Sequence, residues 1–156
     1  MTAFDVDGTS VPLPQTGTHS LWDALEAGGV DVPHGCGTGH CGACTVLLDG
    51  RPTPACIVPK AAAAGAAVRT ARTTALIQLI ESMAAAGAVQ CGFCSPGMVV
   101  TLSWAIRGAV AQGQCLDEHQ VRELLVGHLC RCTGYTAVVH AAVATCRTML
   151  EDSRPS

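Results

Sequence analysis

The sequence predicts an α+β protein, in which a β-rich unit is followed by a helical unit. In the first part, "AFDVDGTSVPL" and "CTVLLDG" each place β-forming residues beside an Asp-Gly pair, Asp7-Gly8 and Asp49-Gly50. Asp-Gly between apolar runs is typical of a hairpin turn, because both central residues of that turn adopt positive φ. In the second part, apolar residues recur at helical spacing. The change of pattern falls between residues 60 and 74.

The β-rich part also contains one predicted helix and one ambiguous segment. Ser20 is the expected N-cap of "SLWDALEAGG", because Asp23 follows three residues later as an acidic variant of the capping box. Gly28 and Gly29 end this helix, since glycine tolerates the left-handed conformation found just after a helix. Residues 59–68, "PKAAAAGAAV", predict either an exposed connector or a weak last strand.

Four helices are predicted in the second part. In "TTALIQLIESMAAAG", large apolar residues recur every three or four positions. Ser95 is the expected N-cap of the next helix, with Pro96 at its first position. Asp117, with Gln120 three residues later, begins the third, and "TAVVHAAVATCRTML" forms the fourth. Because only short loops join these helices, we expect them to pack as a bundle.

Charge and composition argue against two classes of function. The chain has 156 residues, a formal net charge of −3 and no block of lysine or arginine, so nucleic-acid binding has no electrostatic basis. Gln90, Pro96 and several glycines interrupt the longest uncharged stretch, residues 82–106, so no membrane span is expected. The acidic start "MTAFDVDGTS" lacks the apolar core of a signal peptide. We therefore expect a cytoplasmic protein, and in a reducing compartment the clustered members of its ten cysteines indicate metal or redox sites.

Four cysteines in the first part have the spacing of an iron–sulfur site. The pattern C-x4-C-x2-C followed by a distant cysteine is that of plant-type ferredoxins. Four glycines between residues 35 and 42 let backbone amides approach and donate to the sulfurs. Zinc is the alternative, but zinc ribbons favour two close cysteine pairs. This first cysteine set consists of Cys36, Cys41, Cys44 and Cys56.

Four more cysteines form two close pairs in the helical part. "QCGFC" supplies one pair and "CRC" supplies the other, and each pair lies at a turn between predicted helices. Antiparallel helices would bring the two turns together at one end of the bundle. The spacing alone fits zinc almost as well as an iron–sulfur cluster. This second cysteine set consists of Cys91, Cys94, Cys130 and Cys132.

The motifs "GCGTGHCGACTVLLDG", "QCGFCSPGM" and "LCRCTGY" together resemble the iron–sulfur subunit of the molybdenum hydroxylases. This is the family of xanthine oxidase, aldehyde oxidoreductase and carbon monoxide dehydrogenase, and the resemblance covers about residues 4–150. It implies a plant-type ferredoxin-like (β-grasp) domain over residues 1–72 and a four-helix bundle over residues 73–156. Each domain would bind one 2Fe–2S cluster, through the first and second cysteine sets respectively.

The resemblance also implies partners and a place at the cofactor. Gln90 and Cys132 would approach a molybdopterin, in its cytosine dinucleotide form, bound by a separate large subunit. A medium subunit would carry FAD, and heterotrimers would assemble into a higher oligomer. In this family asparagine usually precedes "LCRC", whereas this chain has His128.

We therefore predict an electron-transfer subunit of a molybdenum oxidoreductase, relaying electrons from the molybdopterin centre to a flavin or another acceptor. The chain has no paired acid/base carboxylates and no glycine-rich dinucleotide loop, so no substrate chemistry is expected on it alone. A free-standing ferredoxin and a zinc-stabilised interaction module are the alternatives. 2Fe–2S proteins are red-brown and zinc proteins are colourless, so colour separates the zinc module from the iron–sulfur interpretation.

Several residues remain outside these assignments. Cys115 and Cys146 are expected to be small packed thiols, although a disulfide between them is open. His34 and His40 are expected to support the first cysteine loop. For His128, tuning of the second cluster and a surface position are equally open.

Overall fold

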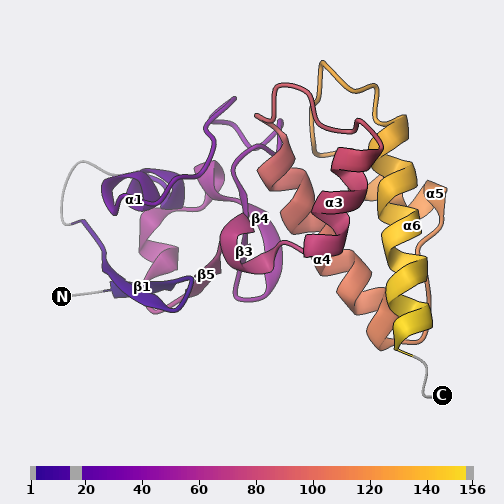
Figure 1. The fold of residues 1–156 in the computed structure, drawn as a ribbon. Coiled ribbons are helices and arrows are strands. Elements are labelled where there is room, and N and C mark those ends of the chain that lie inside the picture. The colour runs from indigo at the N-terminus through magenta and orange to yellow at the C-terminus, as the bar shows by residue number, and fades with distance from the viewer. Residues whose placement is uncertain (1–2, 15–18, 154–156) are drawn as a thin grey trace.

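The computed structural model describes residues 3–14 and 19–153, which form an α+β fold. Figure 1 shows a sheet with helix α1 on one side of the molecule and helices α3–α6 on the other. The strands are β1 (Ala3–Val6), β2 (Thr9–Pro12), β3 (Thr45–Leu48), β4 (Arg51–Pro54) and β5 (Ala67–Arg69). The α-helices are α1 (Leu21–Ala27), α2 (Ala71–Thr74), α3 (Ile77–Ala85), α4 (Ser95–Ala111), α5 (Glu118–Leu124) and α6 (Thr136–Asp152).

The five strands form one sheet in the order β2-β1-β5-β3-β4. Both predicted hairpins are present, because β1 pairs antiparallel with β2 and β3 with β4. Asp7 and Asp49, at the two turns, have φ of 53° and 47°, as such turns require. The sheet thus contains both strand pairs that the Asp-Gly signals predicted.

The ambiguous segment "PKAAAAGAAV" leads into the last strand of the chain, which was one of its two predicted alternatives. Lys60–Ala63 form a 3₁₀ turn, and strand β5 begins at Ala67. This strand lies between β1 and β3, parallel to the first and antiparallel to the second. Val68 is fully buried there. The alanine-rich sequence gave only a weak strand signal, because the strand has just three residues. Its hydrogen bonds come from the neighbouring strands β1 and β3 on its two sides.

Helix α1 packs against one face of the sheet and has the predicted capping box. The hydroxyl of Ser20 accepts from the N–H of Asp23, whose carboxylate accepts from the N–H of Ser20. Leu21 and Leu25 enter the apolar core of the sheet half beside Phe4. The indole N–H of Trp22 donates to the carbonyl of Val32 over 2.8 Å, which fixes the chain that leads to the first cysteine loop.

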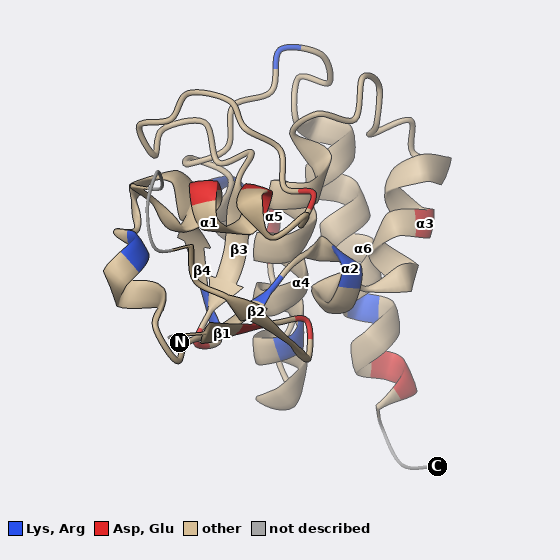
Figure 2. Cartoon of the chain, turned by 90° about the vertical axis from the view of Figure 1, so that its left-hand side faces the viewer, with Lys and Arg blue, Asp and Glu red and all other residues tan. Residues whose placement is uncertain are grey.

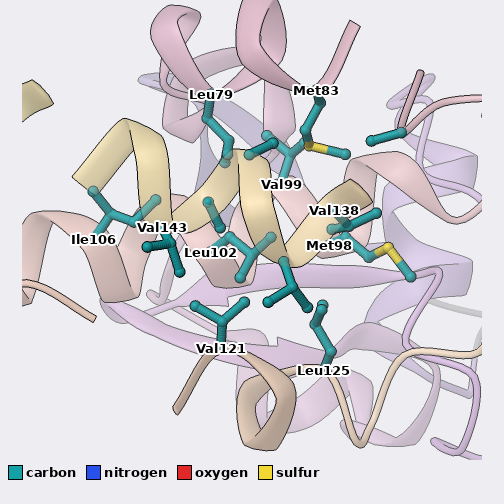
Figure 3. Packing of buried hydrophobic residues seen from close by; sticks show 14 of the residues in the cluster. Leu79, Met83, Met98, Val99, Leu102, Ile106, Val121, Leu125, Val138 and Val143 are labelled. Carbon is teal, nitrogen blue, oxygen red and sulfur yellow. The ribbon is translucent and has the colours of Figure 1, made fainter. Parts of the chain in front are cut away.

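The helical half has its own apolar core, built by one face of each of four helices (Figure 3). The core contains Leu79 and Met83 from α3, Met98, Val99, Leu102 and Ile106 from α4, Val121 and Leu125, and Val138 and Val143 from α6. None of the described helices is both long and apolar enough to cross a membrane. Helix α5 begins as predicted, with Asp117 and Gln120 forming a capping box.

Two predicted helix boundaries are wrong. The first helix of this half is interrupted, so α2 ends at Thr74 and α3 begins at Ile77. The hydroxyl of Ser103 accepts from the N–H of Leu76 at the break, which replaces the missing helical hydrogen bond. Ser95 is the first residue of α4 and not its cap, and Cys94 takes the N-cap position without a side-chain hydrogen bond.

The two halves meet where the start of α4 lies against the first cysteine loop. A Cβ atom built on Gly97 would lie 2.1 Å from the carbonyl oxygen of Gly42, so the two backbones touch directly. Gly42 itself has φ +70°, and a Cβ there would lie 2.4 Å from the carbonyl oxygen of Gly127. Only glycine fits at these two positions. The loops that carry the two cysteine sets are therefore held close together.

Candidate iron–sulfur sites and their junction

The loops that carry both cysteine sets lie at the same end of the molecule. In Figure 1 the loop before α4 and the loop before α6 lie together at the top of the helical half, and the first cysteine loop lies beside them. Figure 2 shows few charged positions on these loops. The structure thus brings together the turns that the sequence had predicted to meet.

The first cysteine set divides into two pairs of thiols. The N–H of Cys36 donates to the sulfur of Cys41, and the N–H of Cys41 donates back to the sulfur of Cys36, both over 3.4 Å. Cys44 and Cys56 form the other pair, because the N–H of Ala55, next to Cys56, donates to the carbonyl of Cys44 over 3.2 Å. Cys36 is exposed and Cys44 is buried, so the set spans the depth of the loop.

Backbone amides surround the sulfurs of the first set, as the glycine-rich loop predicted. The N–H groups of Thr38 and His40 donate to the sulfur of Cys36, over 3.4 and 3.3 Å. The N–H of Gly39 donates to the sulfur of Cys56 over 3.3 Å. A Cβ at Gly35 would lie 2.7 Å from the sulfur of Cys41, so any larger residue at this position would clash with that sulfur.

The electrostatics of the first set differ between its exposed and its buried side. Hydrogen bonds from the hydroxyl and the N–H of Thr38 lower the pKa of Cys36 to about 5. Burial raises the pKa of Cys44 to about 11. A buried thiolate needs a positive partner, which a bound metal supplies. His34 stacks on Trp22 with ring centroids 3.9 Å apart, and the ring of His40 is hydrogen-bonded to Thr38, so both histidines have the supporting role expected.

The second cysteine set also divides into two pairs, and each pair joins one cysteine from each motif. The sulfurs of Cys91 and Cys132 lie 3.7 Å apart at the exposed side. Cys94 and Cys130 lie deeper, and each of these thiols affects the pKa of the other. Burial raises the pKa of Cys94 to about 12. Burial also raises the pKa of Cys130, but hydrogen bonds from Thr133 outweigh it and bring the value to about 7.

Tyr135 fastens the loop that carries Cys130, a role that the sequence did not indicate. Its hydroxyl accepts from the N–H of Cys130 over 2.7 Å and donates to the carbonyl of His128 over 2.8 Å. Its backbone has φ of 66°, a left-handed conformation that costs energy in a residue with a side chain. The conformation directs the ring back over the loop, so these two hydrogen bonds help to offset the cost.

Gln90 lies against the second cysteine set. Its side-chain amide donates to the carbonyl of Cys132 over 3.1 Å, and both residues are exposed. The contact links the two loops of the second set at their outer side. This is the part of the set that another protein could approach.

His128 lies at the junction of the two cysteine loops and not on the surface, so that alternative is wrong. Its side chain is buried, and its Nε2 atom lies 2.9 Å from the hydroxyl of Thr101 on α4. Its Nδ1 atom has no hydrogen-bond partner and faces Gly42, where a built Cβ would come within 2.5 Å of it. Burial lowers the pKa of His128 to about 4.

The arrangement of the thiols fits two-iron clusters. Each iron of a 2Fe–2S cluster takes two protein ligands, so each cluster needs two pairs of thiolates. Both cysteine sets offer such pairs. Among the described residues, no group of three or more histidine, cysteine, aspartate or glutamate side chains is arranged around a single metal ion.

Comparison with known proteins finds two iron–sulfur family models, one over the part of the chain with the first cysteine set and one over the part with the second. The model of the 2Fe-2S iron-sulfur cluster binding domain family matches residues 4–77, and that of the 2Fe-2S binding domain family matches residues 66–143. The xanthine dehydrogenase iron-sulfur-binding subunit of Escherichia coli O157:H7 is 38% identical over 122 residues, which cover 76% of this chain and 76% of the relative. Caffeine dehydrogenase subunit gamma of Pseudomonas sp. (strain CBB1) is 37% identical over 125 residues, covering 78% and 73%.

The fold agrees with a solved structure over almost its full length. Quinoline 2-oxidoreductase from Pseudomonas putida 86 contains a chain with a TM-score of 0.82 and 28% identity, and the match covers 98% of this chain and 97% of that one. The family models, the relatives and the paired thiols agree with the resemblance of the three sequence motifs. This chain belongs to the molybdenum hydroxylase family, as the 2Fe–2S subunit that transfers electrons within the oxidoreductase.

Proposed function

We propose that this chain relays single electrons from a molybdopterin centre on a large partner subunit, through two 2Fe–2S clusters, to a flavin or another acceptor. The observation that carries the proposal is a hydrogen bond between the two cysteine loops. The N–H of Leu129 donates to the carbonyl of Cys41 over 2.9 Å. Cys41 belongs to the first set, and Leu129 directly precedes Cys130 of the second. The chain thus joins its two sets by a short path of bonds.

We assign one cluster to each cysteine set. Each bound cluster would accept and return one electron, and the residues of the chain would fix its place and its surroundings. Cys36, Cys41, Cys44 and Cys56 would hold the first cluster, and Cys91, Cys94, Cys130 and Cys132 the second. The contacts within thiol pairs support this assignment, because each pair would serve one iron.

The two clusters would differ in potential. Amide donors to the sulfurs and exposure to solvent both change the reduction potential of such a cluster. The first set receives several backbone N–H bonds from its loop, whereas the hydroxyl of Thr133 lies 3.2 Å from the sulfur of Cys130 in the second. Different surroundings would give two distinguishable spectroscopic signals.

The second set would face the molybdopterin, with Gln90 and Cys132 nearest to it. Large apolar side chains around this set are exposed, and exposed apolar patches mark sites of protein association. We infer that the large subunit covers this surface and holds the cofactor in its cytosine dinucleotide form. The exposed side chains are Val89, Phe93, Val126 and Leu129.

The remaining features of the assembly belong to the same proposal. We infer a plant-type ferredoxin-like (β-grasp) domain over residues 1–72 and a four-helix bundle over residues 73–156. The two separate apolar cores support this division. A medium subunit would carry FAD beside the first cluster, and heterotrimers would form a higher oligomer in the cytoplasm.

Rapid mixing of the purified complex with candidate substrates tests the relay. Xanthine, caffeine, quinoline and an aromatic aldehyde are suitable probes, because relatives of this chain carry those names or classes. Freeze-quench electron paramagnetic resonance should show the second-set signal before the first-set signal. A colourless protein with stoichiometric zinc would instead support the interaction module, and a coloured monomer without partners would support a free ferredoxin.

A further inference from the structure

The helical half contains a third pair of thiols, outside both cysteine sets. Cys115 lies in the loop between α4 and α5, and Cys146 lies in the middle of α6. Neither is part of a disulfide in the structure. The N–H of Leu116, the residue after Cys115, donates to the sulfur of Cys146 over 3.4 Å, and the pKa of Cys115 responds to burial and to the thiol of Cys146. Two sulfurs from segments 31 residues apart therefore face each other.

One of the two thiols can be reached from solvent. Cys115 is half-buried, whereas Cys146 is fully buried. Gln114 and Leu116, the neighbours of Cys115, line a groove of about 590 Å³ between α4 and α5. Because Cys115 is the partly exposed member of the pair, a small molecule from solvent reaches its sulfur before that of Cys146.

We propose that Cys115 and Cys146 are a site of reversible covalent modification, at which a small-molecule disulfide of the glutathione type converts the two thiols into an intramolecular disulfide. The thiolate of Cys115 attacks one sulfur of the small disulfide and releases one small thiolate. The sulfur of Cys146 then attacks the sulfur of Cys115 and releases the second. The small disulfide gains two electrons, the protein loses two, and the two cysteine protons pass to the released thiolates.

The surroundings of the pair set the rate of this exchange. Burial and the neighbouring thiol of Cys146 raise the pKa of Cys115 to about 11. Little thiolate is then present near neutral pH, and only the thiolate attacks a disulfide. The exchange is therefore slow, and incubations of hours are appropriate.

The disulfide would close a ring that contains α5 and the loop of Cys130 and Cys132. A cross-link restrains the unfolded chain, so the oxidised form unfolds at higher temperature. This consequence rests on the proposed function, because the loop inside the ring would hold part of the second cluster. The covalent reaction itself does not depend on that function.

The experiment uses the purified, coloured complex and oxidised glutathione. After incubation, tryptic peptides with and without reductant show whether Cys115 is joined to Cys146, and intact mass shows the loss of two hydrogen atoms. The visible absorption of the clusters is recorded in parallel. We expect the cross-linked peptide, unchanged absorption, and a rise of roughly 5–10 °C in the temperature at which the absorption is lost on heating. Reductant should reverse all changes.

Two variants serve as controls. Cys115→Ser and Cys146→Ser should each abolish the cross-link and the thermal shift, and the first should leave the cluster absorption as it is. A stable glutathione adduct on Cys115 without a cross-link would overturn the proposal, as would a complete lack of reaction at both residues. Cross-links that involve the two cysteine sets, accompanied by loss of colour, would count against the cluster assignment instead.

Discussion

The backbone N–H of Leu129 and the carbonyl oxygen of Cys41 lie 2.9 Å apart and join the two cysteine loops across the junction of the sheet and helical halves. Both groups belong to the backbone, so no substitution other than proline at position 129 removes them. What holds them together is the packing of Gly42, Gly97 and His128 around the same point. The contact between the loops therefore depends on the side chain of His128. It also depends on the lack of a side chain at Gly42 and at Gly97.

His128→Asn should disturb both clusters. The ring of His128 lies against Gly42, the residue after Cys41, and His128 itself lies two residues before Cys130. Asparagine places its amide near the position of Nδ1 and is too short to reach Thr101, so the buried hydroxyl loses its partner. The cost is about 1–3 kcal/mol of folding stability. Both signals in electron paramagnetic resonance should shift at unchanged iron content.

Glutamine provides the matched control for His128. Its amide reaches the position of Nε2, so His128→Gln should keep the hydrogen bond to Thr101 and most of the wild-type spectrum. Thr101→Val removes the same hydrogen bond from the other side and should resemble His128→Asn. Equal effects of the asparagine and glutamine variants would show that this hydrogen bond is irrelevant.

Tyr135→Phe should change the second cluster and leave the first unchanged. The substitution removes the acceptor of the N–H of Cys130 and the donor to the carbonyl of His128. Unfolding should become easier by about 1–3 kcal/mol, since these groups are partly buried. The N–H of Cys130 is then free to donate to a sulfur, which shifts the potential of the second cluster upward. A redox titration that follows both signals separately measures this, with the first signal as internal control.

Gly35→Ala should prevent the first cluster from forming. The added methyl group would lie 2.7 Å from the sulfur of Cys41, and the loop cannot yield without moving that sulfur. Gly108→Ala is the control, because a Cβ there meets nothing within 4 Å and alanine favours the helix. Iron and labile sulfide should fall by about half in the first variant and stay unchanged in the second. A full complement in Gly35→Ala would contradict the placement of the first cluster.

The sequence predicted much of this structure because local signals agree with the global fold. The Asp-Gly turns and the capping boxes at Ser20 and Asp117 depend only on neighbouring residues, and all are present. Strand β5 was ambiguous because its place depends on partners far along the chain. The break before α3 was missed because the hydroxyl of Ser103, a distant residue, satisfies the N–H of Leu76.

In the candidate site, too, local features were predictable from the sequence and features that depend on distant residues were not. Cysteine spacing and loop glycines are visible in the sequence, and the structure brings the members of each set together. Tyr135 and Thr101 carry no signal of their own, because their roles depend on the loops packing against each other. For Tyr135, the only available sign was its position next to Gly134, just after the second cysteine pair.

Metal analysis tests both clusters together. Two 2Fe–2S sites require about four irons and four labile sulfides per chain. Chemical determination on the freshly purified complex measures both quantities against protein concentration. Two irons per chain would leave one cysteine set without a cluster, and stoichiometric zinc would reject both.

The direction of electron flow can be tested with one ligand variant in each set. Cys41→Ser alters the first set, which we place on the acceptor side, and iron–sulfur cores favour thiolate over hydroxyl. If the complex assembles, substrate should still reduce the second cluster, while transfer to the acceptor slows. Cys132→Ser alters the second set, which we place on the molybdopterin side, and should stop electrons at the first step. Rapid mixing with substrate, in which cluster bleaching and acceptor reduction are followed separately, distinguishes the two. The reverse order would follow if Cys41→Ser stopped reduction of the second cluster while Cys132→Ser left it intact.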